Sequence, residues 1–266
     1  MKRVHSNAMR LAWRALPVPL KNRLKPPLQS AISELFRQCG FGFVEFQGLL
    51  KHLRSNGFSP RTIIDAGAFI GDWSKDAHRI FPNAQIVMVE GNEENRQILA
   101  TACKDIANSA FEIAVLGPEK KSSVAFYVNS QGSSVLPELT SFGQEKVVVP
   151  MLRLDDIMED RLSVGPVLLK LDVQGFELEV LRGAPNTLAK SEVVIIESSL
   201  LTYNEGSPLM AEVISFLDRS GFAVYDFCGQ HRRESDGALF QTDIVFAKFD
   251  SALRLKKKFW NAEPDN

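Results

Sequence analysis

Three things are scarce in this 266-residue sequence: cysteine, net charge and long apolar runs. Cys39, Cys103 and Cys228 are odd in number and widely spaced, which argues against a disulfide framework or a zinc cluster and favours a reducing compartment. A net charge of −1 gives the chain as a whole no attraction for nucleic acid. No apolar run reaches the length of a membrane span or a signal sequence. We therefore expect a cytoplasmic protein with no nucleic-acid partner.

Acidic residues are absent from the first 33 positions, which carry seven Lys or Arg residues. Met9, Trp13 and Leu16 could line one side of a short basic helix. This segment is either a mobile, solubilising terminus or an arm that touches the inner face of the membrane. We expect a basic arm and helical cap over residues 1–58, with helical pattern from 30 to 54, and a basic tail over 251–266.

The segment between them, residues 59–250, alternates apolar runs with helical periodicity. The predicted strands are 61–67, 85–90, 111–117, 167–173 and 192–198, followed by closing strands at 222–227 and 242–248; the predicted helices are 72–80, 92–106, 176–181 and 209–220. Strands rich in Val, Ile and Leu are typical of a parallel sheet that helices cover on both faces. We predict an α/β domain with a mostly parallel seven-stranded sheet, which binds ligands at the carboxyl ends of its strands.

An insertion near 122–152 interrupts the alternation. Its two ends, 124–128 and 146–152, alternate like an antiparallel pair, and a Gly- and Ser-rich loop with Ser133 and Ser134 joins them. The insertion is either a lid whose serines contact a substrate or an edge hairpin without a ligand.

No G-x-G-x-x-G is present, which argues against a dinucleotide site. The first strand instead runs into TIIDAGAFIGDW, in which an acid precedes two glycines that are four positions apart. This pattern is closer to the loop that binds S-adenosylmethionine, because close backbone approach is required but a pyrophosphate site is not. The candidate cofactor residues of this loop are Asp65, Ala66, Gly67, Phe69 and Gly71.

The next two strands end in further candidate cofactor residues. Glu90 ends the second strand and could accept hydrogen bonds from both ribose hydroxyls, with Gly91 and Asn92 in the turn after it. Ala114 lies near the end of the third strand. An acid followed by Gly-Asn is also an ordinary turn, so the signal comes from the order of the motifs.

Charged residues are concentrated in the fourth strand and its exit, LLKLDVQGFELEVLRGA. Lys170 and Asp172 share one face of the strand, and Glu177 opens the next helix. A buried Lys is rare unless it is paired. The three charges are either a structural pairing or a catalytic group, with Asp172 beside the cofactor and Glu197, at the end of the fifth strand, as a second carboxylate on the same rim.

These motifs resemble the FkbM-type methyltransferases over about residues 61–248. The opening D-x-G-A-N-x-G-D is matched by Asp65, Gly67, Ala68, Gly71 and Asp72, and the long L-K-x-D-x-E-G-x-E-x-x-V-L-x-G by Leu169, Lys170, Asp172, Gly175, Glu177, Val180, Leu181 and Gly183. The resemblance implies a Rossmann-like class I methyltransferase fold and S-adenosylmethionine-dependent O-methylation, often of sugars, lipid-linked glycans or polyketide-type products.

Two positions depart from the family pattern. Phe69 replaces the usual Asn in the glycine loop, and Gln174 replaces the usual Glu. If Glu at that position is the family's proton acceptor, this protein needs another base, and we assign the acid–base role to Asp172, with Glu197 as the alternative. The predicted catalytic residues are thus Asp172, Lys170 and Glu197. The predicted substrate residues are Ser133, Ser134, Glu177, Tyr203 and Asn204, with the acceptor entering between the insertion loop and LLTYNEGSP; Tyr203 and Asn204 could also be an ordinary loop.

Two other functions remain open from the sequence: a dinucleotide-dependent oxidoreductase on the same sheet, and an inactive binding module that keeps the fold. The expected partner is a small-molecule or glycan acceptor. The sequence does not determine the oligomeric state, and a dimer is one option. The four histidines lie far apart along the chain, so no metal site is predicted.

Overall fold

The computed structural model describes residues 46–129, 132–139, 145–233 and 235–255, all within one compact unit of residues 45–266. The predicted basic helix with Met9, Trp13 and Leu16, its membrane contact, and most of the basic tail lie outside the described residues. Helix α4 (Phe46–Ser55), which the sequence assigns to the N-terminal cap, packs on α5 through an edge-to-face contact of Phe46 with Trp73. No helix among the described residues is long and apolar enough to cross a membrane.

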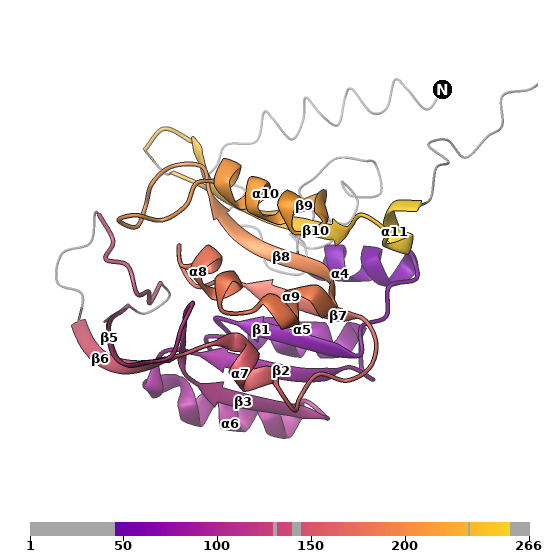
Figure 1. Cartoon of the computed structure of the whole chain (residues 1–266), viewed down its shortest axis with the longest axis horizontal. Helices are drawn as coiled ribbons and strands as arrows, with labels where there is room; N and C mark the ends of the chain where they lie inside the picture. Colours follow the sequence, from indigo (N-terminus) through magenta and orange to yellow (C-terminus); the bar gives the residue numbers. More distant parts are fainter. Residues whose placement is uncertain (1–45, 130–131, 140–144, 234, 256–266) are drawn as a thin grey trace, which may run out of the picture. The chain divides into compact units, whose positions relative to one another are not determined.

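Seven strands form the main sheet, in the order β3-β2-β1-β7-β8-β10-β9 (Figure 1). They are β1 (Thr62–Ala66), β2 (Gln85–Glu90), β3 (Ser109–Ile113), β7 (Val167–Leu171), β8 (Ser191–Ser199), β9 (Phe222–Arg232) and β10 (Leu239–Lys248). The first five in the order run parallel, and β10 is antiparallel to both of its neighbours. The predicted α/β fold with a mostly parallel seven-stranded sheet is confirmed.

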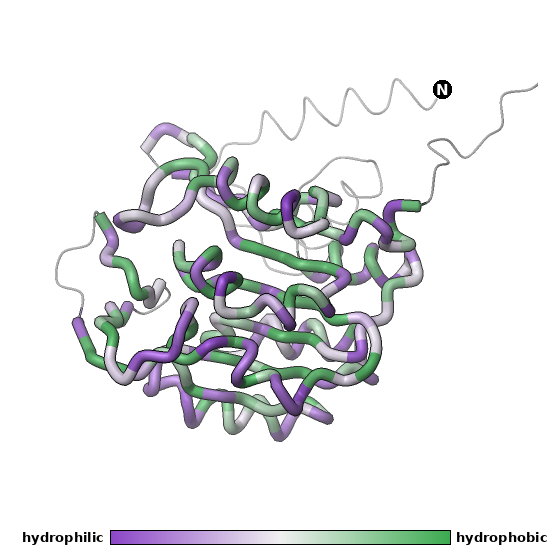
Figure 2. The backbone as a smooth tube through the Cα atoms, in the orientation of Figure 1, coloured by the Kyte–Doolittle hydropathy of each residue, from purple (hydrophilic) through white to green (hydrophobic). Residues whose placement is uncertain are grey.

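Helices cover both faces of this sheet, because the strands are apolar on both sides (Figures 1 and 2). The helices that follow α4 are α5 (Asp72–Ile80), α6 (Arg96–Asp105) after the 3₁₀ turn η1 (Glu93–Asn95), α7 (Leu154–Met158), α8 (Glu177–Arg182), α9 (Pro185–Lys190), α10 (Met210–Arg219) and α11 (Ala252–Leu255). Strand residues such as Ile64, Leu169 and Ile196 form a fully buried core with Val180 of α8 and Leu217 of α10. The sequence missed α7 and α9, which have fewer than two turns and so show little periodicity.

A small second sheet, in the order β4-β6-β5, contains the predicted insertion. Its strands are β4 (Val115–Leu116), β5 (Lys121–Val128) and β6 (Glu145–Leu152), and β5 and β6 form the expected antiparallel pair. The prediction of one strand over 111–117 was wrong. The chain leaves the edge of the main sheet after Ala114, and Val115 packs with Phe126 and Met151 in the small sheet.

Strands β1 and β7 leave the main sheet side by side. Their register pairs Asp65 with Lys170, and the N–H of Asp172 donates to the carbonyl of Ala66 over 2.9 Å. Gly67 follows in left-handed conformation, with φ of 81°, and a Cβ there would lie 1.8 Å from the carbonyl oxygen of Asp172. Glycine at this position therefore allows the two exits to pack in direct backbone contact.

The backbone contact between Gly67 and Asp172 predicts that Gly67→Ala strongly destabilises the folded protein. The added methyl overlaps the backbone of Asp172 and the left-handed φ is strained, so we expect a loss of about 3 kcal/mol or more in the free energy of unfolding. Gly237→Ala is the matched control, because Gly237 has a φ of 73° but no atom within 4 Å of the added Cβ. It should lose about 1 kcal/mol. Equal losses in urea denaturation would show that steric overlap is not the reason for Gly67.

Candidate active site

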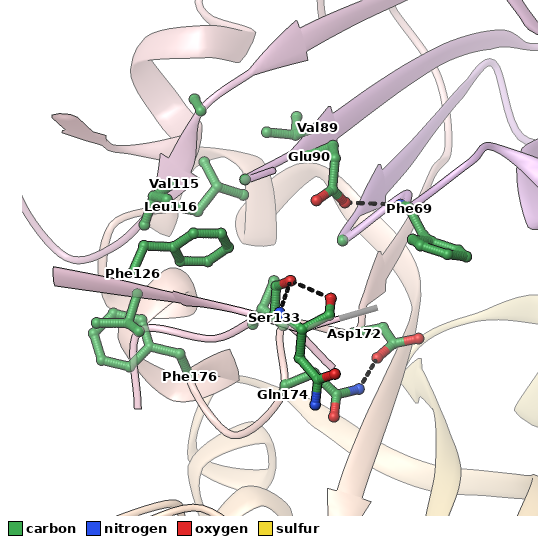
Figure 3. Close-up of a pocket in the computed structure, with 16 residues that line it drawn as sticks. Phe69, Val89, Glu90, Val115, Leu116, Phe126, Ser133, Asp172, Gln174 and Phe176 are labelled. Carbon is green, nitrogen blue, oxygen red and sulfur yellow. Dashed lines mark hydrogen bonds between the residues drawn. The ribbon is translucent and has the colours of Figure 1, made fainter. Parts of the chain in front are cut away.

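A pocket of about 350 Å³ opens at the carboxyl ends of β1, β2 and β7 (Figure 3). Its lining consists of Gly67, Phe69, Val89, Glu90, Gly91, Ala114, Val115, Leu116, Phe126, Asn129, Ser133, Val135, Asp172, Val173, Gln174 and Phe176. The described lining contains two carboxylates and no Lys, Arg or His. The pocket therefore favours a neutral or cationic ligand over an anionic one.

Glu90 is held in the pocket by backbone N–H groups. Its Oε2 accepts a hydrogen bond from the N–H of Phe69 and its Oε1 one from the N–H of Asn92, each 2.8 Å long. Burial raises the pKa of Glu90, and these two hydrogen bonds oppose that rise. Each carboxylate oxygen keeps acceptor capacity, so Glu90 could receive two ligand hydroxyls. The Asn92 side chain does not line the pocket, because its Oδ1 caps η1 through the N–H of Glu94.

Phe69 has a φ of 50°, in the left-handed region, and its side chain is 38% exposed. Asn adopts this conformation more readily than Phe, because its short polar side chain bonds locally. The departure from the family pattern thus changes backbone strain as well as a side-chain contact. The loop still delivers the N–H of residue 69 to Glu90.

The other end of the pocket is apolar (Figure 3). Val115, Leu116 and Phe126 come from the small sheet, and Phe176 precedes α8. The Phe126 ring lies against Gly91, where a Cβ would be 2.7 Å from its Cζ atom. A flat aromatic group fits between such walls. The sequence predicted the hairpin and named Ser133 of its loop, but it did not predict that Phe126 would face the pocket.

Besides Asn92, three predicted cofactor residues do not line the pocket: Asp65, Ala66 and Gly71. Asp65 and Ala66 are fully buried, and the Asp65 Oδ2 atom accepts a hydrogen bond of 2.7 Å from Ser74 of α5. Gly71 precedes α5 and packs against Met88 and Leu99, so its missing side chain makes room for packing. The reason is the register, which turns the Asp65 side chain toward the face that α5 covers.

Lys170 is the buried cation of the site. Its Nζ lies 3.3 Å from Asp65 Oδ1, 3.2 Å from Asp172 Oδ2 and 5.6 Å from the centre of the Trp73 ring. Burial by itself would lower the pKa of Lys170, but the carboxylates of Asp172, Asp65 and Asp243 outweigh burial and raise it. Lys170 therefore stays an ammonium and acts as the counter-ion of Asp172.

A single amide joins the two predicted catalytic carboxylates. The Gln174 Nε2 atom donates to Asp172 Oδ1 over 2.8 Å and to Glu197 Oε2 over 2.9 Å. The same Glu197 oxygen accepts a 3.3 Å hydrogen bond from Gln241, whereas Glu197 Oε1 accepts none from the described residues. Burial raises the pKa of Glu197 well above its usual value, and the charges of Asp172, Asp243 and Glu177 add to this while Lys170 opposes it.

Asp243 is a carboxyl that sequence reasoning missed. It faces Glu197 across the antiparallel β8–β10 pair and is 3% exposed. Gly229 is the extra residue of a bulge in β9, and a Cβ there would lie 2.1 Å from Asp243 Oδ2. Burial, aided by Asp172 and opposed by Lys170, raises the pKa of Asp243 to about 8.

The predicted substrate residues have different surroundings. Ser133 lines the pocket, whereas Ser134 is buried and donates to the carbonyl of Gln174. Glu177 is also buried, and its Oε1 accepts from the N–H groups of Val173 and Gly175, so it closes the turn before α8 and does not face a substrate.

Asn204 is buried as well and donates to the carbonyl of Gln174, and the ring of Tyr203 pairs with Phe240 at 6.1 Å. The expected acceptor route between the insertion and LLTYNEGSP is bridged by two backbone hydrogen bonds. The N–H of Leu139 donates to Tyr203, and that of Glu205 donates to Pro137. An acceptor therefore needs another approach, and the partly exposed side of Asp172 and Glu197 offers one. Within the described part of the chain, no group of His, Cys, Asp and Glu is arranged to hold a metal ion.

The high pKa of Asp243 predicts a pH dependence of stability. Its ordinary value is 3.8 and its folded value about 8, so the folded protein binds the extra proton between these limits. The stabilising contribution is complete below pH 3.8 and is lost as pH rises through 8. Asp243→Asn removes this titration. We expect the variant to gain free energy of unfolding relative to wild type as pH rises from about 4 to 8, by at most about 1.4 kcal/mol per pH unit, and to gain no more above pH 8.

Urea denaturation at several pH values measures this difference. Gln97→Asn, at an exposed position of α6, changes no titratable group; it is the control and should show no such trend. Glu177, whose pKa is about 7, is present in wild type and in both variants, so its titration cancels when their stabilities are compared. A constant difference between Asp243→Asn and wild type would contradict the assignment.

Solved structures that are similar to this chain include three methyltransferases, each with a TM-score of 0.43. A precorrin-6y C5,15-methyltransferase from Geobacter metallireducens GS-15 has 12% identity, over 75% of this chain and 86% of that one. A magnesium protoporphyrin IX methyltransferase from Synechocystis PCC 6803 with bound S-adenosylmethionine has 12% identity, over 76% and 77%. An O-methyltransferase family protein from Burkholderia thailandensis has 11%, over 82% and 57%. No curated protein sequence matches the chain.

The model of the methyltransferase FkbM domain matches residues 65–224, which is more than half of the chain. The pocket fits S-adenosylmethionine: Glu90 can accept the ribose hydroxyls, the walls around Phe126 suit the adenine ring, and the cation-free lining suits the sulfonium group. The strand order is that of a Rossmann-like class I methyltransferase fold. The chain therefore belongs to the FkbM methyltransferase family and is an S-adenosylmethionine-dependent methyltransferase.

Proposed function

We propose that this enzyme is an O-methyltransferase that acts on a hydroxyl of a neutral sugar, glycan or related natural product. The observation that carries the proposal is the carboxylate pair Asp172 and Glu197, joined by Gln174 at the end of a pocket whose described lining has no cationic side chain. Bound S-adenosylmethionine supplies an electrophilic methyl group on a cationic sulfonium. Glu90 and the walls around Phe126 would hold its adenosine part, and Gly67 would let the backbone approach it closely.

In this proposal Glu197 is the general base. An alcohol has a high pKa, so its proton leaves only as the new oxygen–carbon bond forms and the sulfur–carbon bond breaks. Glu197 Oε1 accepts no hydrogen bond from the described residues, and the raised pKa of Glu197 makes it a stronger base near neutral pH. Both oxygens of Asp172 are already engaged, one by Lys170 and one by Gln174. Asp172 thus acts as a fixed negative charge, which favours a cationic ligand.

The charge of the site supports a neutral acceptor. Among the described residues, the ammonium of Lys170 is the single cation that interacts with four carboxyl groups, those of Asp65, Asp172, Glu197 and Asp243. A carboxylate or phosphate on the acceptor would meet these acidic groups, and the described pocket lining offers no Lys, Arg or His to pair with it. Sugar hydroxyls, in contrast, can donate hydrogen bonds to carboxylates.

The two other readings of the sequence are less compatible with these observations. A dinucleotide would place a pyrophosphate in a pocket with two carboxylates and no described cationic side chain. An inactive binding module would not require a base with a free oxygen. Methyl transfer from labelled S-adenosylmethionine tests all of these: we expect neutral sugars and glycans to be labelled and matched uronic acids not to be. Labelling of uronic acid carboxyl groups would contradict the proposal.

The cofactor pocket predicts selective binding that does not depend on knowing the acceptor. In calorimetric titration we expect S-adenosylmethionine to bind and NAD not to bind. Phe126→Ala removes an aromatic wall and should weaken S-adenosylmethionine binding about tenfold. Phe227→Ala, at a 44% exposed position of β9, should leave the affinity unchanged. Equal affinities of the two variants would exclude Phe126 from the cofactor site.

The base assignment predicts a separation of rate from cofactor binding. With a labelled acceptor in hand, Glu197→Gln should lower kcat at least about 100-fold and keep the Kd of S-adenosylmethionine within about threefold. Asp172→Asn should weaken cofactor binding as well, because it removes a negative charge from the pocket. Normal turnover by Glu197→Gln, with Asp172→Asn inactive, would move the base to Asp172.

A further inference from the structure

Gln174 has a backbone conformation that two separate segments maintain. Its φ is 54°, in the left-handed region, which costs about 1 kcal/mol or more for a residue other than glycine. Its carbonyl oxygen accepts a 2.8 Å hydrogen bond from Ser134 Oγ and another from Asn204 Nδ2. Ser134 belongs to the β5–β6 connection and Asn204 follows β8. A strained backbone that two separate segments stabilise by hydrogen bonds is typical of a residue whose position matters for function.

The Gln174 side chain uses both of its amide hydrogens on carboxylates. Nε2 donates to Asp172 Oδ1 over 2.8 Å and to Glu197 Oε2 over 2.9 Å (Figure 3 shows the Asp172 bond). Two carboxylates that both lie within hydrogen-bond distance of one nitrogen repel each other, and without a donor between them they tend to share a proton. An amide supplies this donor at any pH, because it does not ionise.

We propose that Gln174 is the positioning residue of the transfer centre: it keeps Asp172 and Glu197 as two separate carboxylates and leaves Glu197 Oε1 open for the acceptor proton. The inference rests on the proposed function, in which Glu197 is the base. The Gln174 donor favours the ionised form of Glu197. Removing the donor should make the pair hold a proton at higher pH.

The same region contains other titratable groups, which the test has to take into account. Facing Glu197 and Asp172 are Lys170 of β7, Asp65 of β1, Glu177 of α8, Asp243 of β10 and Tyr203 after β8, with Cys228 of β9 next to Asp243. All of them are unchanged in variants of Gln174. A difference between wild type and such a variant therefore reports on the carboxylate pair.

The experiment measures proton release on cofactor binding and needs no acceptor. Calorimetry in buffers of different ionisation heat gives the number of protons released when S-adenosylmethionine binds. The same measurement with S-adenosylhomocysteine, which lacks the sulfonium charge but has the same amino and carboxyl groups, is subtracted. The difference isolates protons that the positive charge expels from nearby carboxyls.

We expect Gln174→Met to shift the pH of greatest proton release upward by about one unit relative to wild type. Gln174→Glu, which has the native shape but brings its own carboxyl, should also release more protons near neutral pH. Gln241→Met removes a donor from Glu197 alone and should give a smaller shift. Gln97→Met, at an exposed position of α6, should match wild type.

The outcomes separate this inference from the proposed function. Identical proton release by wild type, Gln174→Met and Gln174→Glu would overturn the positioning role, even if the enzyme methylates a sugar. Failure of S-adenosylmethionine to bind the wild-type protein would overturn the cofactor site and with it both proposals. If Gln174→Met does not fold, Gln174→Leu decides, because it also removes the donor and adds no titratable group.

Discussion

The buried ammonium of Lys170 is the interaction on which the site depends. It lies within ion-pair distance of Asp65 on one strand and of Asp172 at the exit of the next, so it joins β1 and β7 where both leave the sheet. Without this positive charge, burial of Asp65, and of Asp243 behind Glu197, would place several like charges in a low-dielectric core. The described residues place one cation there, and burial raises the pKa values of Asp65, Glu197 and Asp243.

Most of the fold and half of the site follow from patterns that are local in the sequence. Alternation of apolar runs with helical periods predicted the main sheet, and the positions at strand ends predicted that Glu90 and Asp172 would line the pocket. These inferences succeed because the place where a parallel strand ends, and hence the position of the side chain at its carboxyl end, is determined by residues nearby in the sequence. Long-range pairing is not needed to make them.

The parts that were missed depend on register and on packing between distant segments. Asp65 was expected to face the cofactor, yet its pairing with Lys170 turns it under α5. Phe126 faces the pocket only because β4 leaves the main sheet and pairs with β6. Asp243 approaches Glu197 through the antiparallel return of β10, and the bulge at Gly229 that makes room for it is a feature of tertiary pairing.

The small sheet connects the two ends of the pocket mechanically. Phe126 of β5 closes the apolar end, and eight residues later Ser134 holds the carbonyl of Gln174 beside the carboxylates. Backbone hydrogen bonds between Tyr127 and Ser134 keep these two points in one rigid piece. The apolar wall around Phe126 and the turn that carries Gln174 are therefore parts of one connected unit. A substitution that displaces β5 would disturb the amide between Asp172 and Glu197 as well as the apolar end of the pocket.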